Sequence, residues 1–324
     1  MKRTLAALAP IVLVAAVVRV FGQGQLRLSL AVLEAILQGA TPLLLCGLAV
    51  ALGFRAGVFN LGGEGQLVVG AVAATAVGVH APAWTVWTFP AVLVAGALAG
   101  VAWAALAAWL KRSRGAPEVL STILLNFVAL QLSRYLIDYG NLLNEASHAY
   151  PMSDEVGPAA QLAPIHLGAF ELPPSILGAA LLALALDLAL ARTRPGFELR
   201  LTGASPTVAR AQGFSPARAV WTAFLAGGAL AGLAGAISVA SVTHRLYWSP
   251  STGTGYTAVA VALVADLRPR AVVPAALAFA ALEAGAQAAE RQFAVPHATA
   301  AGIEGLLVLA VIAQRALVAG RSAA

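Results

Sequence analysis

Charged residues are scarce in this sequence: they make up 10% of its 324 residues, where a soluble domain carries about 25%. The 20 basic and 14 acidic residues cannot cover the surface of a soluble protein of this length. Cysteine occurs once, as Cys46 within an apolar run, so no internal disulfide and no metal-thiolate cluster is possible. These scarcities exclude an ordinary soluble enzyme, a disordered chain and a fibre.

The motifs of common catalytic sites are also missing. There is no G-x-S-x-G and no H-E-x-x-H, and the two lysines, Lys2 and Lys111, do not follow the glycines of a Walker A loop. The five histidines are His80, His148, His166, His244 and His297. None has metal-ligand spacing to another histidine or to the cysteine, so we expect no catalytic residue, metal or cofactor in this chain. If ATP drives its activity, another chain binds the ATP.

Long apolar runs account for most of the sequence, which is 60% hydrophobic. Ten runs are found: Leu5–Val18, Ala31–Gly53, Gly65–Val79, Trp84–Leu110, Val119–Ile137, Pro173–Ala191, Ala219–Val242, Tyr256–Ala265, Ala271–Ala289 and His297–Ala313. They predict an all-α polytopic membrane protein with about ten transmembrane helices in a single domain over 1–324. The first run resembles a signal peptide, but we favour an uncleaved span. The run from Tyr256 is too short for a full span and predicts a broken or tilted helix.

The distribution of basic residues predicts the orientation. If the N-terminus lies inside and ten spans alternate, 15 of the 20 lysines and arginines fall on the cytoplasmic side. Both termini are then cytoplasmic, the loop at about 138–172 is extracytoplasmic, and the basic segment at about 192–218 is cytoplasmic. The net charge of +6 therefore reflects topology rather than nucleic-acid binding, because no basic run is interleaved with aromatic residues. Small-xxx-small patterns at Gly96–Gly100 and Gly228–Gly232 indicate close helix packing.

The cytoplasmic segment contains a short polar helix. Ser205 and Pro206 are typical of a helix N-cap and first position, and Gly213 is typical of the residue that ends a helix. The helix of about two turns between them is too polar to span a membrane. It is either a handle for a cytoplasmic partner or a surface loop that carries inside-positive charge.

A glycine-rich stretch at 57–66, GVFNLGGEGQ, interrupts an otherwise hydrophobic region. We expect Asn60 to cap the following helix and Glu64 to lie in its first turn, where the helix dipole favours a carboxylate. Irregular backbone at membrane depth is tolerated only inside protein or along a polar cavity. The stretch is therefore either a broken-helix element near a transport route or a tight cytoplasmic turn.

Polar groups also occur within the predicted spans. Thr122 and Asn126 are four residues apart and share a helix face, so they either line a substrate path or form interhelical hydrogen bonds. The ionisable residues within spans are Glu34, Asp187, Glu283 and Glu304. Such groups are functional candidates in a membrane, although each can instead pair with a neighbour or lie near an interface. They are scattered and form no spaced relay.

Several strings together resemble a known family. They are GVFNLGGEGQLVVGA at 57–71, APEVLSTILLNFVALQL at 116–132, TGASPTVARAQGFSPARAV at 202–220, GGALAGLAGA at 227–236 and GYTAVAVALVA at 255–265. The sequence resembles the permease subunits of ABC importers, in the branch of the ribose and branched-chain amino acid permeases, and within it the nucleoside permeases. The family pattern usually has another apolar residue where Gly62 or Gly63 stands, so this sequence is richer in glycine there, and the resemblance does not define the local backbone.

The resemblance implies a lipid-embedded permease that pairs with a second permease, a paralogue. Cytoplasmic ATPase subunits would bind ATP and Mg, and an extracytoplasmic binding protein would deliver a nucleoside. The coupling segment would comprise Gly203, Ser205, Pro206, Ala209, Arg210 and Gly213. The polar residues of the matched motifs, which we expect along the translocation path, are Asn60, Glu64, Gln66, Thr122 and Asn126. The alternatives are a permease for ribose-like sugars or amino acids and, with less support, an ion-coupled secondary transporter.

Overall fold

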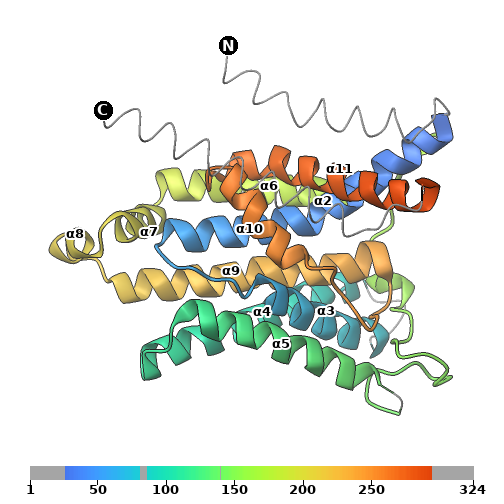
Figure 1. Cartoon of the computed structure of the whole chain (residues 1–324), viewed down its shortest axis with the longest axis horizontal. Coiled ribbons are helices and arrows are strands. Elements are labelled where there is room, and N and C mark those ends of the chain that lie inside the picture. The colour runs from blue at the N-terminus through green and yellow to red at the C-terminus, as the bar shows by residue number, and fades with distance from the viewer. Residues whose placement is uncertain (1–25, 81–85, 139, 294–324) are drawn as a thin grey trace.

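The computed structural model describes residues 26–80, 86–138 and 140–293, without the side chains of 26–29, 289 and 291–293. The described chain is mostly helical, as the apolar runs predict (Figure 1). The predicted first span, the predicted last span and Glu304 lie outside the described residues.

The helices follow the apolar runs closely. They are α2 (Leu26–Arg55), α3 (Gly63–His80), α4 (Thr88–Arg114), α5 (Glu118–Ile137), α6 (Pro174–Arg192), α7 (Arg194–Ala204), α8 (Pro206–Ala211), α9 (Pro216–Ser238), α10 (Thr254–Val264) and α11 (Pro269–Phe293). Within the described ranges, six helices are long and apolar enough to cross a membrane: α2, α4, α5, α6, α9 with its extension to Thr243, and α11. The 18-residue α3 and the 11-residue α10 occupy two further predicted spans.

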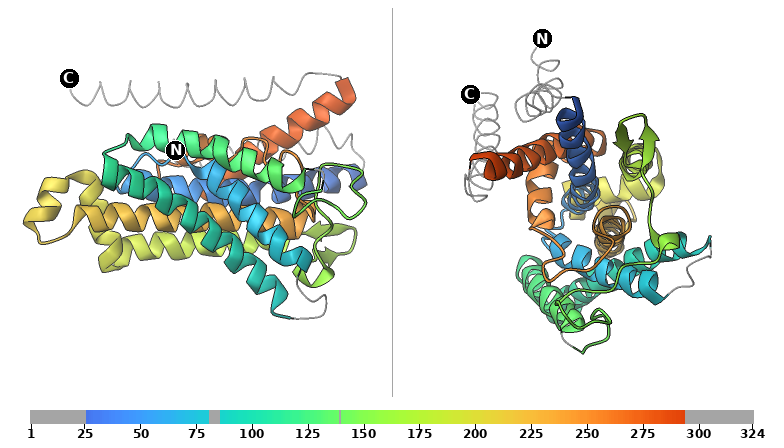
Figure 2. Two further views of the ribbon diagram at one scale, coloured as in Figure 1. Left: turned by 90° about the horizontal axis from the view of Figure 1, so that it is seen from below. Right: turned by 90° about the vertical axis from the view of Figure 1, so that its right-hand side faces the viewer.

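Two long helices, α2 and α9, form the centre of the bundle. In each, 72% of the most apolar window is buried, whereas 28% to 39% is buried in the other four spans. Figure 2 shows the remaining helices arranged around these two when the bundle is viewed along its length. The side chains of Leu43, Leu44, Leu45 and Leu48 on α2 are 1% exposed or less, so α2 carries much of the core.

Glycine allows α4 and α9 to approach backbone to backbone. A Cβ atom on Gly100 would lie 2.1 Å from the carbonyl oxygen of Gly228, and one on Gly232 would lie 2.2 Å from the carbonyl oxygen of Gly96. The two small-xxx-small motifs therefore pack against each other, which confirms the close packing expected from the sequence.

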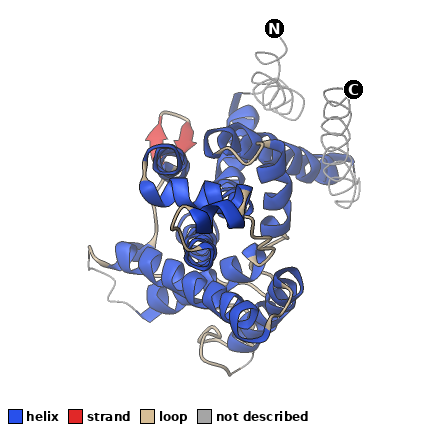
Figure 3. Cartoon of the chain, turned by 90° about the vertical axis from the view of Figure 1, so that its left-hand side faces the viewer, coloured by secondary structure: helices blue, strands red, loops and turns tan. Residues whose placement is uncertain are grey.

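The two ends of the bundle differ. One end carries α7 and α8, and we call it the α8 end. The opposite end, on the right in Figure 1, carries residues 140–172, with the 3-10 helix η1 (Pro158–Ala160) and an antiparallel hairpin of β1 (Ile165–Leu167) and β2 (Phe170–Leu172). We call it the hairpin end, and Figure 3 shows the two strands of the hairpin. In the hairpin, Ile165 pairs with Leu172 and Leu167 with Phe170. This hairpin was not predicted from the sequence.

Candidate functional site

The chain turns back into the bundle after α2 ends at Arg55. Residues 56–62 carry it to the start of α3, and Asn60 lies beside Gly227. Gly227 is near the middle of the span Pro216–Thr243. The helix α3 therefore begins deep in the bundle and not at its surface, which makes the glycine-rich stretch a break at membrane depth.

A second helix begins at the same depth. With 11 residues, α10 is about 16 Å long, roughly half the thickness of a bilayer core. Its first turn touches the first turn of α3, because a Cβ on Gly255 would lie 2.2 Å from the backbone nitrogen of Glu64. Only glycine permits this approach. The short helix predicted from Tyr256 is thus a half-helix whose N-terminus meets that of α3, and we call this meeting point the α3–α10 junction.

Glu64 bridges the junction. Its Oε2 accepts a hydrogen bond of 2.7 Å from the backbone amide of Gly255, and the hydroxyl of Ser251 is a further partner. The carboxylate therefore lies at the N-terminus of α10, where the helix dipole favours negative charge. The predicted position in the first turn of α3 is confirmed. The partner helix, 191 residues away in sequence, was missed, because a partner so distant leaves no local signal.

Asn126 on α5 fixes the other side of the junction. Its Oδ1 accepts from the amide of Gly65 at 2.9 Å, and its Nδ2 donates to the carbonyl of Leu61 at 2.9 Å and to the hydroxyl of Tyr256 at 3.1 Å. One buried amide thus joins α5, the segment before α3 and α10. These are the interhelical hydrogen bonds that the sequence left open as one interpretation. The indole nitrogen of Trp103, near Gly65, is buried and has no partner among the described residues.

Asn60 and Gln66 form a buried pair within the break. Asn60 Oδ1 accepts from the backbone amide of Gly62 at 2.9 Å and from Gln66 Nε2 at 3.3 Å. In return, Asn60 Nδ2 donates to Gln66 Oε1 at 3.4 Å. The expectation that Asn60 caps α3 is wrong in detail: its side chain closes a turn before the helix, which begins at Gly63. Thr122 hydrogen bonds to the carbonyls of its own helix and packs toward Gly62.

The structure therefore brings together all five residues that we expected along the path. Four of them, Asn60, Gln66, Thr122 and Asn126, are 4% exposed or less, whereas Glu64 is partly exposed. Their role in transport stays a prediction, because buried hydrogen-bonded groups can also serve only to hold helices together.

The segment at 192–218 holds two helices where the sequence predicted one. The helix α7 was missed, although Thr193 caps it and Pro195 lies in its first turn. The predicted short helix is present as α8: Ser205 Oγ accepts from the amide of Val208 at 3.3 Å, and Gly213 adopts a φ of +79° after the helix.

The predicted coupling residues on α8 differ in exposure. Ala209 is fully buried and packs α8 against the rest of the protein, whereas Arg210 is exposed and the neighbouring Val208 is 47% exposed. The role of these residues in coupling stays a prediction. A Cβ on Gly203, at the end of α7, would lie 2.0 Å from the carbonyl oxygen of Arg55. The α7–α8 pair is therefore in direct backbone contact with the end of α2, where the chain turns toward the α3–α10 junction.

Comparisons with known proteins place the chain in a family. Residues 32–312 match the family model described as a branched-chain amino acid transport system permease component. The chain belongs to this family of permeases. It is 34% identical over 289 residues to the glucose ABC transporter permease TsgB13 of Haloferax volcanii, covering 86% of this chain and 76% of that protein.

Other relatives carry different substrate names. The permease is 31% identical to the guanosine ABC transporter permease NupP of Bacillus subtilis (86% of this chain, 80% of the relative). It is 25% identical to the nucleoside permease NupB of Lactococcus lactis (77% and 71%). No solved structure matches the chain. The predicted family and the location as a multi-pass protein of the inner membrane are confirmed.

The ionisable residues predicted within the spans of the permease all have a partner where the structure describes them. Asp187 forms an ion pair with Arg270, and Glu34 Oε1 accepts from the backbone amide of Glu171 at 2.7 Å. Glu283 Oε1 accepts from the hydroxyl of Thr252 at 3.4 Å. These three carboxylates have separate partners, and no contact between them is seen among the described residues.

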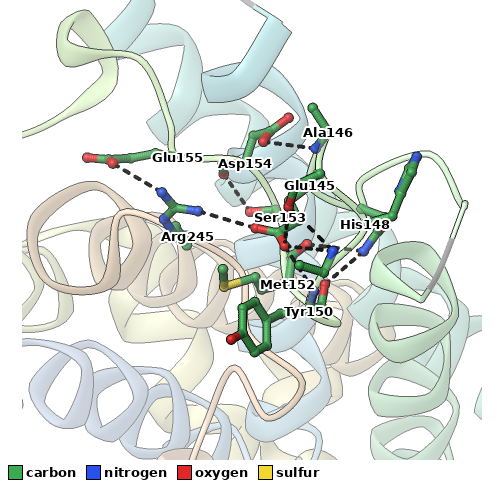
Figure 4. Close-up of polar contacts among 12 residues, drawn as sticks. Glu145, Ala146, His148, Tyr150, Met152, Ser153, Asp154, Glu155 and Arg245 are labelled. Atoms are coloured by element: carbon green, nitrogen blue, oxygen red, sulfur yellow. Dashed lines mark hydrogen bonds and ion pairs between the residues drawn. The ribbon is translucent and has the colours of Figure 1, made fainter.

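At the hairpin end of the permease, a guanidinium lies between two carboxylates (Figure 4). Arg245 contacts Glu155 at 3.4 Å and Glu145 at 3.9 Å. The Ser147 hydroxyl donates to Glu145 at 2.7 Å, and the Tyr150 and Ala149 amides donate to the same carboxylate. With Arg245, these donors hold the pKa of Glu145 below its ordinary value, although partial burial opposes them. The cluster ties the loop after α5 to the segment after α9.

Proposed function

We propose that this permease imports nucleosides, as one of two membrane subunits coupled to a separate ATPase. The guanosine and nucleoside permeases among its relatives support this substrate class. The observation that carries the coupling is the contact between Gly203 and Arg55, because it joins the exposed helix α8 to the α3–α10 junction through backbone atoms.

The coupling mechanism follows from this contact. A cytoplasmic ATPase that docks on α8 would push α7 against the end of α2. Because Gly57, with φ of +75°, also lies against Gly203, the push would reach residues 56–62 and the start of α3. Closely packed backbones transmit a displacement with little loss. Binding and release of ATP and Mg by the ATPase would then move α3 against α10.

Among the five predicted pathway residues, we assign substrate contact to Glu64 and positioning to the others. Glu64 is partly exposed and holds two helix starts together. In the proposed cycle, its bond to Gly255 breaks when the junction opens. Alanine at Glu64 should therefore reduce transport more than expression. An equal fall in both would leave Glu64 a purely structural group.

The proposed partners are a second permease that is a paralogue, the ATPase, and an extracytoplasmic binding protein that delivers the substrate. In the proposed topology both termini are cytoplasmic, the α8 end faces the ATPase and the hairpin end faces the binding protein. A tag at Glu155 should be reached from outside intact cells, and a tag at Ser205 only after permeabilisation. The reverse labelling pattern would overturn this orientation.

A sugar permease is the second candidate, because the glucose permease of Haloferax volcanii is 34% identical. Uptake of labelled guanosine in cells with and without the gene, challenged by excess ribose or glucose, separates the two. Gene-dependent guanosine uptake that neither sugar blocks supports the nucleoside proposal. Gene-dependent uptake of a sugar alone moves the substrate to that class.

The same assay tests the ion-coupled alternative. Uptake by an ABC importer should stop when the ATPase gene is deleted and should survive a protonophore as long as ATP is maintained. Uptake that persists without the ATPase but collapses with the ion gradient would refute the proposed coupling.

A further inference from the structure

A cavity of about 280 Å³ lies between α2, α11 and the segment that connects α9 to α10. Nine of its sixteen lining residues carry a polar side chain, and none carries an aromatic ring. The polar residues include Gln38 on α2, Ser251 and Thr252 before α10, and Glu283 and Gln287 on α11. Six of these nine polar residues carry a hydroxyl group, so the wall offers several hydrogen-bond donors and acceptors beside its apolar surface. We call it the hydroxyl cavity.

This polarity is unusual for its position. Gln38 and Glu283 project from α2 and α11, two helices that are long and apolar enough to cross a membrane. Polar and ionisable side chains are costly at such depth unless they face protein or water. The side-chain amides of Gln38 and Gln287 have no hydrogen-bond partner among the residues that the structure describes. A ligand or water can satisfy these groups.

The backbone around the cavity is irregular. Thr243 belongs to the π-helix Val239–Thr243, and the π-helix is a rare form that occurs frequently at functional sites. The other wall is the non-helical segment 249–253, which leads into the half-helix α10. Discontinuous helices of this kind form the substrate sites of many transporters.

The cavity also adjoins the α3–α10 junction. Ser251 lines the cavity, and its hydroxyl is a partner of the Glu64 carboxylate. Its Oγ also accepts from the amides of Gly253 and Thr254 at 3.3 and 3.2 Å. An opening of the junction would therefore change the wall of the cavity.

We propose that the hydroxyl cavity binds the sugar ring of the transported substrate, with Glu283 accepting hydrogen bonds from ring hydroxyls and Gln38 and Gln287 completing the contacts. This inference rests on the proposed import of nucleosides or sugars. Because the lining offers many hydrogen-bonding groups and no aromatic ring for stacking, it suits a pentose or hexose and not a nucleobase.

Transport by variants gives the first test. Glu283→Gln should lower the maximal rate of guanosine uptake about tenfold, as loss of a charge-assisted hydrogen bond does. The KM should stay unchanged, because the binding protein sets it in the proposed system. Glu290→Gln, an exposed residue seven positions further along α11, is the matched control and should transport as the wild type does. Wild-type rates in Glu283→Gln would overturn the proposal.

A second test does not depend on transport, so it separates failure of this site from failure of the proposed function. In a Cys46→Ala background, Thr252→Cys is treated with a charged thiol reagent in purified permease. It should react at least about tenfold faster than Leu44→Cys, whose site is fully buried in the core. Ser249→Cys serves as a second cavity variant if Thr252→Cys does not fold.

Ligand protection identifies the occupant. Excess ribose should slow the labelling of Thr252→Cys, and guanine base should not. Labelling as slow as at Leu44→Cys, or protection by the base but not by ribose, would overturn the assignment. If the wild type shows no gene-dependent uptake while ribose still protects the cysteine, the proposed function fails and the sugar site stands.

Discussion

The starts of α8 and α3 are both rich in turn-forming residues, but their hydrogen-bond partners lie at different distances along the chain. In α8, Ser205 caps its own helix and Gly213 follows its end, so the partners lie within a few residues. At the start of α3, the amide of Gly65 bonds to Asn126, and Glu64 bonds to Gly255. The first helix start is encoded locally, and the second depends on two distant helices.

This difference bears on function. A locally encoded helix can be pushed as a unit without losing its shape, which suits a segment that transmits force. A helix start held by distant partners changes when those partners move, which suits a gate. The contact of Gly203 with Arg55 lies between the two regions.

The largest expected effect is at the exposed face of α8. Val208→Asp places a charge where we propose that the ATPase docks, and transport should fall about thirtyfold or more, as at an interface hot spot. Expression and thermal stability should match the wild type, because Val208 is 47% exposed. Uptake assays measure transport, and thermal melting of the purified protein measures stability. Ser113→Asp, on an exposed site of α4 at the same end, should keep transport. Full transport by Val208→Asp would remove α8 as the docking helix.

The second-largest effect is expected at the α3–α10 junction, where the first turns of the two helices touch. Gly255→Ala puts a Cβ 2.2 Å from the Glu64 nitrogen, so the backbones must separate. Overpacking of this kind costs about 1 to 3 kcal/mol, which should lower the unfolding midpoint of the purified protein. Gly178→Ala is the control, since nothing lies within 4 Å of a Cβ there. Equal midpoints for the two variants would show that the junction is not tightly packed.

A smaller effect is expected when the loss of stability caused by a substitution at Asn126 is compared with that at Thr122. Asn126→Leu leaves the buried amide of Gly65 and carbonyl of Leu61 without their partner, at a cost of about 1 to 3 kcal/mol. Thr122→Val removes a hydroxyl that bonds only within its own helix, so its cost should be below about 1 kcal/mol. Chemical or thermal unfolding of the two variants tests this order. A Thr122→Val protein that is stable but transports poorly would favour a path contact for Thr122.

The smallest effect is at the hairpin end. Because the pKa of Glu145 is lowered in the folded protein, the ionised carboxylate stabilises the fold at neutral pH. That stabilisation is complete above the ordinary glutamate pKa and is lost as the pH falls through the lowered one. Melting temperatures across acidic pH should therefore decline less steeply in Glu145→Gln than in the wild type. Parallel curves would show that Glu145 does not contribute.

The sequence indicated much of the fold because hydrophobic runs and caps are local signals. The runs that became α2, α4, α5, α6, α9 and α11 were readable from composition alone. The hairpin at Ile165–Leu172 was missed, because its short strands lie among prolines and polar residues and give little alternation. The helix α7 was missed because Pro195 and Gly196 resemble a loop, although proline is well placed in a first turn.

The residues of the candidate site were predicted from the sequence, but their contacts with one another and with distant helices were not. Asn60, Glu64, Gln66, Thr122 and Asn126 were selected because they are polar within apolar sequence. Their partners could not be deduced, since Gly255 is 191 positions from Glu64. The burial of Ala209 was also beyond the sequence, because helical periodicity over six residues does not show which side packs against α7 and α9.

The sequence by itself determined the membrane character, the positions of the long helices, the caps of α8 and the breaks before α3 and α10. Each of these depends on composition or on neighbours within a few residues. Only the tertiary structure decided that the two breaks meet, that α4 and α9 touch through their glycines, and that Gly203 lies on Arg55. The physical reason is that a glycine allows any backbone segment to approach closely, whereas the packing of the whole bundle decides which segment lies against it.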